Sequence, residues 1–167
     1  MNGVGFSLWL VPEGEARRRL AALIESLARR LGGPVFAPHV TLLAGIRQAE
    51  QDVLMRVEQI LSGSMALSLR FAGPETGDTF FRALYLRVEP SAPLLALHQA
   101  ARGAFDRRDD PPYVPHLSLV YGAPPPAAVV EEMRPLAPAG FEARTLDVYS
   151  TEGPVEAWHR VRRHRLR

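Results

Sequence analysis

Apolar residues recur at two different spacings along the chain, and the spacing changes from one segment to the next. Short apolar or alternating runs predict β-strands over residues 5–11, 39–44, 65–71, 79–88, 113–121, 141–151 and 155–163. Apolar positions at helical spacing predict helices over residues 13–31, 49–61, 92–105 and 129–133. Strands and helices are therefore interspersed along the whole chain.

Glycine and proline divide these segments. Gly32, Gly33 and Pro34 are expected to end the first helix, and the turn-rich residues 73–78 are expected to join two strands into a hairpin. Hairpins are frequent, and no Gly-x-Gly-x-x-Gly sequence follows a predicted strand. The pattern thus favours a two-lobed α+β fold over a doubly wound parallel sheet. We expect one domain over residues 1–167.

Composition narrows the possible chemistry. The sequence has no cysteine, which excludes disulfides, thiolate metal sites and cysteine nucleophiles. It also has no lysine, which excludes Schiff-base chemistry and a Walker-type phosphate site. No apolar run reaches the roughly 20 residues of a membrane span, so we expect a cytoplasmic protein with no membrane partner. We also expect a monomer. Five arginines fall within residues 160–167, where we expect a solvated terminal strand.

One eight-residue sequence occurs twice. Residues 38–45 read Pro-His-Val-Thr-Leu-Leu-Ala-Gly, and residues 115–122 read Pro-His-Leu-Ser-Leu-Val-Tyr-Gly. Four positions are identical and three more keep similar chemistry. Side chains two apart on a strand project from the same face, roughly 6 to 7 Å apart. His39 and Thr41 are therefore expected to share one face, and His116 and Ser118 another.

Two such strands lying side by side would bring two imidazoles and two hydroxyls to one cleft. Hydrolysis of a cyclic phosphodiester needs a base, an acid and hydrogen-bond donors to the non-bridging oxygens. Histidine titrates near neutrality, so one ring can act as base and the other as acid without a metal. No helical His-x-x-x-His and no nearby pair of carboxylates supplies metal ligands, and we expect neither a metal nor another cofactor. The remaining histidines, His98, His159 and His164, are expected to be structural or surface residues.

On these motifs the sequence resembles the 2H phosphoesterase superfamily, and within it the plant and yeast cyclic phosphodiesterase branch. The resemblance extends to residues 6–12, 33–39, 76–81 and 113–121 and covers most of residues 4–160. It implies two antiparallel-rich sheets around a central cleft, with helices outside and pseudo-two-fold symmetry. It also implies hydrolysis of ADP-ribose 1'',2''-cyclic phosphate, or of nucleoside 2',3'-cyclic phosphates to 2'-phosphates.

The resemblance further implies a role for individual residues. His39 and His116 correspond to the acid/base pair, with His116 activating water and His39 protonating the leaving oxygen. Thr41 and Ser118 correspond to the phosphate-binding hydroxyls. The aromatic candidates for substrate binding are Tyr121, Phe81 and Trp9, each of which can also be interpreted as a core residue. The expected partner is a small nucleotide cyclic phosphate.

Two other functions stay open at this point. One is an RNA-end enzyme resembling the bacterial 2'-5' RNA ligases, acting on RNA 3' ends that carry a 2',3'-cyclic phosphate. A long basic groove would favour it, and outside the terminal arginines the chain is mildly acidic. The other is a nucleotide- or RNA-binding module without turnover, against which the intact histidines and hydroxyls of both motifs argue.

Overall fold

The computed structural model describes residues 1–167 as eight strands, four α-helices and one short 3-10 helix. In chain order the elements are β1 (Phe6–Leu10), α1 (Gly14–Leu31), β2 (Val40–Ile46), α2 (Glu50–Leu61), β3 (Leu67–Thr79), β4 (Arg82–Val88), α3 (Ala92–Ala104), β5 (His116–Val120), α4 (Ala127–Met133), β6 (Gly140–Ala143), β7 (Thr145–Ser150), η1 (Val155–Ala157) and β8 (His159–Arg165). The α+β class predicted from the sequence is confirmed.

All eight strands pair in the order β6-β3-β4-β5-β2-β1-β7-β8, and every pairing is antiparallel. The two central strands, β5 and β2, are in register at one residue pair only, Val40 opposite Leu117. The sheet therefore consists of two four-stranded halves joined at a narrow seam. Outward from the seam, each half runs from a motif strand to its antiparallel neighbour, a third strand and an edge strand, which gives the expected pseudo-two-fold order.

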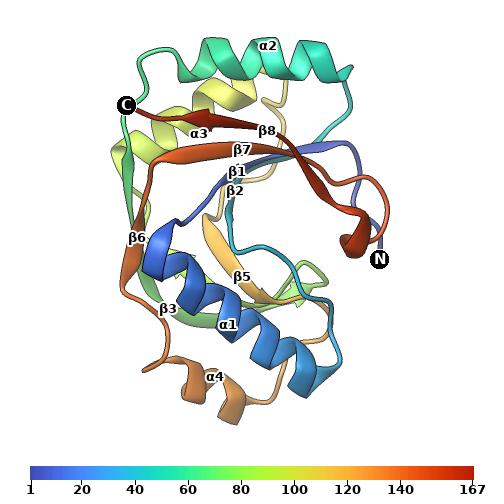
Figure 1. Ribbon diagram of the computed structural model, residues 1–167, viewed down its shortest axis with the longest axis vertical. Helices are drawn as coiled ribbons and strands as arrows, with labels where there is room; N and C mark the ends of the chain where they lie inside the picture. The colour runs from blue at the N-terminus through green and yellow to red at the C-terminus, as the bar shows by residue number, and fades with distance from the viewer.

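Helices cover the two halves separately (Figure 1). In one half α1 packs against β5 and α4 against β3, whereas in the other α3 packs against β2 and α2 lies on α3. The end of α1 follows from its sequence: Gly32 takes φ +72°, a left-handed conformation that glycine adopts without steric cost, and its N–H bonds to the Ala28 carbonyl. The helices thus lie outside the sheet, as predicted.

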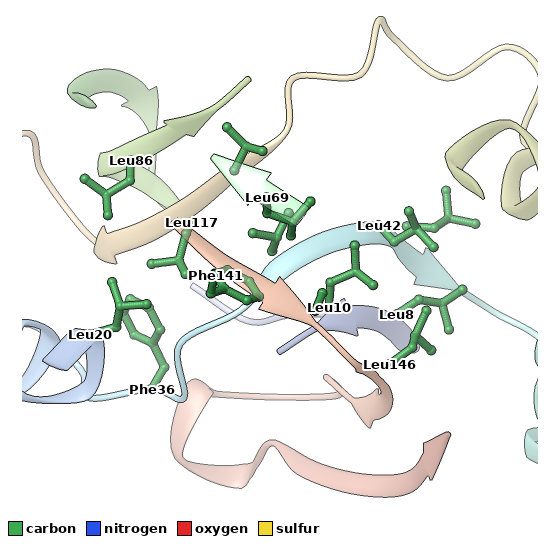
Figure 2. Close-up of a cluster of buried hydrophobic side chains, with 14 of the residues drawn as sticks. Leu8, Leu10, Leu20, Phe36, Leu42, Leu69, Leu86, Leu117, Phe141 and Leu146 are labelled. Carbon is green, nitrogen blue, oxygen red and sulfur yellow. The ribbon is translucent and has the colours of Figure 1, made fainter. Parts of the chain in front are cut away.

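The central strands bury alternate residues in the core. Leu8 and Leu10 of β1, Leu42 of β2 and Leu117 of β5 are almost completely buried in one hydrophobic cluster, which Figure 2 shows. Burial of each such side chain stabilises the fold by roughly 1.5 to 3 kcal/mol. Because side chains alternate across a strand, the residues between these leucines face away from this cluster. The opposite face of the same strands is thereby left for the motif residues.

Residues 73–78 do not form the predicted turn. They belong to β3, and the chain turns at Phe80 and Phe81 instead. Along this stretch β3 pairs with β4 alone, since β6 pairs only with residues 67–70. Pro74 is tolerated there because a strand with one neighbour can lack a donor on its free side.

Two C-terminal segments also differ from the prediction. The single strand predicted over residues 141–151 is two strands, β6 and β7, separated by Arg144. β6 pairs with β3 in one half of the sheet and β7 with β1 in the other, so the chain crosses between the halves at Arg144. The strand predicted over residues 155–163 is the short helix η1 followed by β8. None of the helices combines the length and apolar composition that a bilayer crossing requires.

Candidate active site

The two repeated motifs meet at the seam of the sheet. His39 comes directly before β2, and His116 is the first residue of β5. With Val40 opposite Leu117 in an antiparallel pair, His39 faces Ser118 and Thr41 faces His116. Directly opposite Cβ atoms in such a pair lie about 5 Å apart, and diagonal ones about 7 to 8 Å. The four motif side chains therefore share one face, with the two histidines on one diagonal.

Both imidazole rings are oriented by the same backbone hydrogen bond. The Nδ1 atom of His39 lies 2.6 Å from the Ala37 carbonyl oxygen, and that of His116 lies 2.7 Å from the Val114 carbonyl oxygen. A carbonyl oxygen can only accept, so each Nδ1 carries a hydrogen and donates it. Each neutral ring therefore has its lone pair on Nε2, which is left to exchange a proton with a ligand.

The two histidines differ in burial. His39 is 5% exposed and stacks on Trp9, with the ring centroids 3.6 Å apart and the planes 8° from parallel. Burial lowers the pKa of His39 to about 3, although its backbone hydrogen bond opposes the shift. His116 is half-buried, and burial together with the nearby charge of Arg82 lowers its pKa as well. Both rings are held neutral in the free protein, His39 more strongly.

The two hydroxyls also differ. Ser118 is 5% exposed, and its hydroxyl donates to the Phe81 carbonyl oxygen at 2.7 Å. Thr41 is half-buried, and its hydroxyl makes no hydrogen bond within the protein. Thr41 is thus free to donate to a ligand, whereas Ser118 must first rotate away from Phe81.

Two cavities meet at Thr41, and each contains one of the histidines. The first, of about 320 Å³, is lined by His39 and Thr41 with the aromatic residues Trp9, Phe81, Tyr121 and Trp158. The second, of about 270 Å³, is lined by Thr41 and His116 and by other residues that include Arg82, His98, Arg107, Asp110 and Tyr113; it is called the polar cavity for these charged and titratable groups. A phosphate bound at Thr41 would lie between an aromatic and a polar space.

All three aromatic candidates line the first cavity. Trp9 is almost completely buried between His39 and Tyr149, whose ring is stacked 3.8 Å away, so it packs as a core residue while one face supports the histidine. Tyr121 is buried and stacks on Phe36 at 3.7 Å, and Phe81 meets its edge at 5.2 Å. Half-buried Phe81 is therefore the most accessible of the three.

Several residues of the site lie outside the repeated motifs and were not predicted from the sequence. Trp158 lines the aromatic cavity, 5.6 Å from Phe81 between ring centroids, yet it follows the short helix η1 and belongs to no motif. Tyr113 donates its hydroxyl to the Thr41 carbonyl oxygen at 2.9 Å. His98, expected to be structural, donates from Nδ1 to the next carbonyl of β2, that of Leu42, at 2.8 Å. The stacked Tyr113 and His98 rings thus fix the backbone that carries Thr41.

No group of three or more histidine, aspartate or glutamate side chains is arranged to hold a metal ion. The motif groups that meet at the seam are two imidazoles and two hydroxyls, which lie between the two cavities. The arrangement can exchange protons at two points and donate hydrogen bonds to an oxyanion between them.

Comparison with known proteins gives a family and two named relatives. The profile of the family described as the 2'-5' RNA ligase superfamily matches residues 12–154. An Arabidopsis thaliana protein named cyclic phosphodiesterase is 28% identical over 116 residues, which cover 70% of this chain and 64% of that protein. A Kluyveromyces lactis protein named 2',3'-cyclic-nucleotide 3'-phosphodiesterase is 27% identical over 177 residues, which cover 93% of this chain and 83% of that protein. The chain thus spans slightly less than two thirds of the Arabidopsis protein.

Solved structures share the fold over nearly the whole chain. Escherichia coli LigT in its apo form has a TM-score of 0.67 at 17% identity, with 99% of both chains covered. LigT in complex with 3'-AMP has a TM-score of 0.66 at 15% identity and the same coverage. A Thermus thermophilus protein has a TM-score of 0.66 at 22% identity, with 98% of both chains covered. At these identities the likeness shows the fold.

Proposed function

The chain belongs to the 2'-5' RNA ligase superfamily, and on that premise we propose that it is a cyclic phosphodiesterase. Its substrates in this proposal are nucleoside 2',3'-cyclic phosphates, ADP-ribose 1'',2''-cyclic phosphate, or both, and its products from the nucleosides are 2'-phosphates. The observation that carries the proposal is the placement of both His-x-Thr/Ser motifs on one face at the seam. The names of the two relatives support the same class of reaction.

The proposed reaction is a hydrolysis without a covalent intermediate. The neutral His116 Nε2 removes a proton from water as the water oxygen bonds to phosphorus. The bond from phosphorus to the leaving sugar oxygen breaks, and that oxygen takes a proton from the protonated His39 Nε2. The product is a phosphomonoester with a free hydroxyl. His116 then releases its proton to solvent, and His39 takes up a proton from solvent before the next turnover.

The two cavities support this assignment of roles. In a displacement at phosphorus the attacking and leaving oxygens lie on opposite sides. The leaving oxygen stays attached to the nucleoside, and the aromatic cavity that suits a nucleoside contains His39. Water then approaches from the polar cavity that contains His116.

The low pKa of His39 places a condition on this mechanism. With a pKa of about 3, His39 is almost entirely neutral in the free protein at pH 7. A phosphate anion close to the ring favours the charged form and raises the pKa. The negative charge of the bound substrate is therefore needed to keep His39 protonated, and in the free protein His39 does not carry this proton.

A small nucleotide fits this chain better than a long RNA strand. The arginine-rich strand β8 is paired in part with acidic neighbours: Arg163 pairs with Asp147 at 2.7 Å, Arg160 reaches the same carboxylate at 3.7 Å, and Arg162 lies 3.7 Å from Glu58. Affinity for RNA depends on unpaired cations along the strand. The RNA 3'-end alternative thus depends on a strand whose arginines are partly paired, in a chain that is mildly acidic outside residues 160–167.

A turnover assay tests the proposal. The purified protein should convert 2',3'-cyclic AMP or ADP-ribose cyclic phosphate to the monoester, as measured by chromatography or 31P NMR. The rate of this conversion should be unchanged in excess EDTA. A cyclic-phosphate RNA oligonucleotide serves as the competing substrate, and a preference for it would favour the RNA-end enzyme. Binding of the nucleotides without turnover would favour the non-catalytic module. Loss of turnover in EDTA with recovery on a divalent ion would contradict the two-histidine mechanism.

A further inference from the structure

Arg82, at the start of β4, carries a guanidinium without a partner. It makes no ion pair and no side-chain hydrogen bond, and its Nε atom is fully covered without a partner. Arg107 in the same cavity is different, because it pairs with Asp110 at 2.8 Å and donates to the carbonyls of Ala44 and Gly45. Arg82 is therefore the cation of the polar cavity that remains available to a ligand.

The Arg82 side chain is held by uncharged neighbours. Its guanidinium carbon lies 5.6 Å from the centre of the Tyr85 ring, and Tyr85 is fixed in turn by donating its hydroxyl to Glu75 at 2.9 Å. A Cβ at Gly77 would lie 2.5 Å from the Arg82 carbonyl oxygen and 3.3 Å from its Nε, so only glycine leaves room for this packing. The cation is thus positioned without being neutralised.

The position of Arg82 relative to the motifs gives this cation a use. It lines the polar cavity together with Thr41 and His116, and it does not line the aromatic cavity. It is also close enough to lower the pKa of His116 by its charge, in addition to the larger effect of burial. A phosphate bound at Thr41 would therefore have Arg82 and His116 in the same cavity beside it.

We propose that Arg82 is a further substrate-binding residue, which donates to the non-bridging oxygens of the phosphate. The inference rests on the proposed function and extends it to the charge that develops during reaction. The cyclic phosphodiester carries one negative charge, and attack by water brings more onto its oxygens. A guanidinium offers parallel N–H donors to such a group, and two histidines and two hydroxyls supply no permanent cation.

Several titratable or charged groups surround His116. They comprise Arg82, Tyr85 and Arg87 on β4, His39 beside β2, and His98, Arg107, Asp110 and Tyr113 around the polar cavity. Among the cations only the charge of Arg82 contributes to the shift of the His116 pKa. Arg87 lies opposite His116 in the strand register, but it is paired with Glu75 at 3.5 Å. Arg87 is therefore a matched control on the same strand.

The experiment compares Arg82→Gln, Arg82→Lys and Arg87→Gln with the wild type, after circular dichroism and thermal melting show that each is folded. Arg82→Gln should lower kcat/KM by about 10² to 10³, the usual cost of removing one donor to a developing oxyanion. Arg82→Lys should recover part of the loss, because it restores the charge without the planar fork. Arg87→Gln should stay within about twofold of the wild type, as expected for an exposed, paired arginine. Wild-type kcat/KM in Arg82→Gln would overturn the proposal.

The pH profile separates a role in the reaction from a role in folding. Without the Arg82 charge the pKa of His116 should rise, so the acidic limb of kcat/KM should move to higher pH in Arg82→Gln and return toward the wild type in Arg82→Lys. A fall in rate with an unmoved limb, and with no recovery by lysine, would mean that Arg82 only supports the structure.

Binding of inorganic phosphate, measured by titration calorimetry or 31P NMR, needs no turnover. Weaker binding in Arg82→Gln than in Arg87→Gln would support the anion site even if the wild type hydrolysed no cyclic phosphate. The proposed function would then fail while this inference stood. Equal binding by both variants would overturn the inference even in an active enzyme.

Discussion

The two halves of the site contain the same motif in different surroundings. His39 and His116 lie at equivalent places in the two sheet halves, and each donates from Nδ1 to the carbonyl two residues earlier. His39 is enclosed under Trp9 and opens to an aromatic cavity, whereas His116 is half-buried beside Arg82 in a polar cavity. The repeat thus determines the geometry, and the neighbouring strands determine the protonation of each ring.

The strand next to each motif creates this difference. Trp9 of β1 lies opposite Thr41, and Tyr85 of β4 lies opposite Ser118, so the two aromatic residues occupy equivalent places. Trp9 stacks flat on His39 at 3.6 Å, whereas Tyr85 meets His116 edge-on at 5.4 Å and faces Arg82 with its ring. One histidine is therefore shielded from water and the other is exposed to a cation.

The largest expected effect comes from removing either histidine. His39→Ala and His116→Ala should each lower kcat by about 10² to 10⁴ while the protein stays folded, because each removes one proton transfer. The double variant should lose less than the product of the two losses, since the residues act as a unit. The exposed His159→Ala is the matched control. Steady-state kinetics checks this, and near wild-type turnover in either variant would remove that histidine from the mechanism.

A substrate with an activated leaving group should distinguish the two histidines. An ester that releases a low-pKa phenol needs no proton on its leaving oxygen, so it does not depend on the general acid. If it binds productively and chemistry limits the rate, His39→Ala should lose much less activity toward this ester than His116→Ala. The opposite order would exchange the two roles, and equal large losses would show that both residues mainly bind the phosphate.

Removing the hydroxyls should have smaller and unequal effects. Thr41→Val should lower kcat/KM by about tenfold or more, since it deletes an unpaired donor. Ser118→Ala should lower the rate less but the stability more, because it leaves the partly buried Phe81 carbonyl without its donor, at about 1 kcal/mol. Kinetics and thermal melting of both variants test this together. A larger loss of rate in Ser118→Ala would mean that its hydroxyl leaves Phe81 when substrate binds.

Local patterns in the sequence were sufficient to predict much of this arrangement. Helical spacing predicted α1 within one residue of its observed start, and the repeated motif predicted the shared face of His39 and Thr41. The resemblance to the 2H phosphoesterases is confirmed at the level of the family. These features depend on residues close together in the chain, where spacing and steric preference decide the outcome.

Features that depend on distant contacts could not be predicted. The break at Arg144 exists because β6 and β7 find partners in different halves of the sheet. Trp158 reaches Phe81, and Tyr113 reaches the Thr41 carbonyl, only after strands far apart in the sequence have paired. Arg82 is one of twenty arginines in the sequence, and only the structure shows that its guanidinium is unpaired. Neither the fact that it is an arginine nor the residues next to it in the sequence indicate that it is unpaired.

The smallest expected effect concerns stability in acid and measures the difference in burial directly. His39 has a pKa of about 3 in the folded protein against 6.5 when unfolded, so between these values the unfolded chain binds a proton that the native protein does not. The stabilising effect of neutral His39 is complete above pH 6.5 and is lost progressively as the pH falls toward 3. Between about pH 7 and 5 the wild type should therefore lose up to about 2 kcal/mol more unfolding free energy than His39→Gln. Its melting temperature should fall more steeply over the same range. His116→Gln should change the slope in the same direction, and by less because His116 is less enclosed.

Differential scanning calorimetry across this range checks the order, with exposed His159→Gln as the control. Equal slopes in the wild type and His39→Gln would show that His39 is not held neutral by burial, and the two histidines would then differ in position alone.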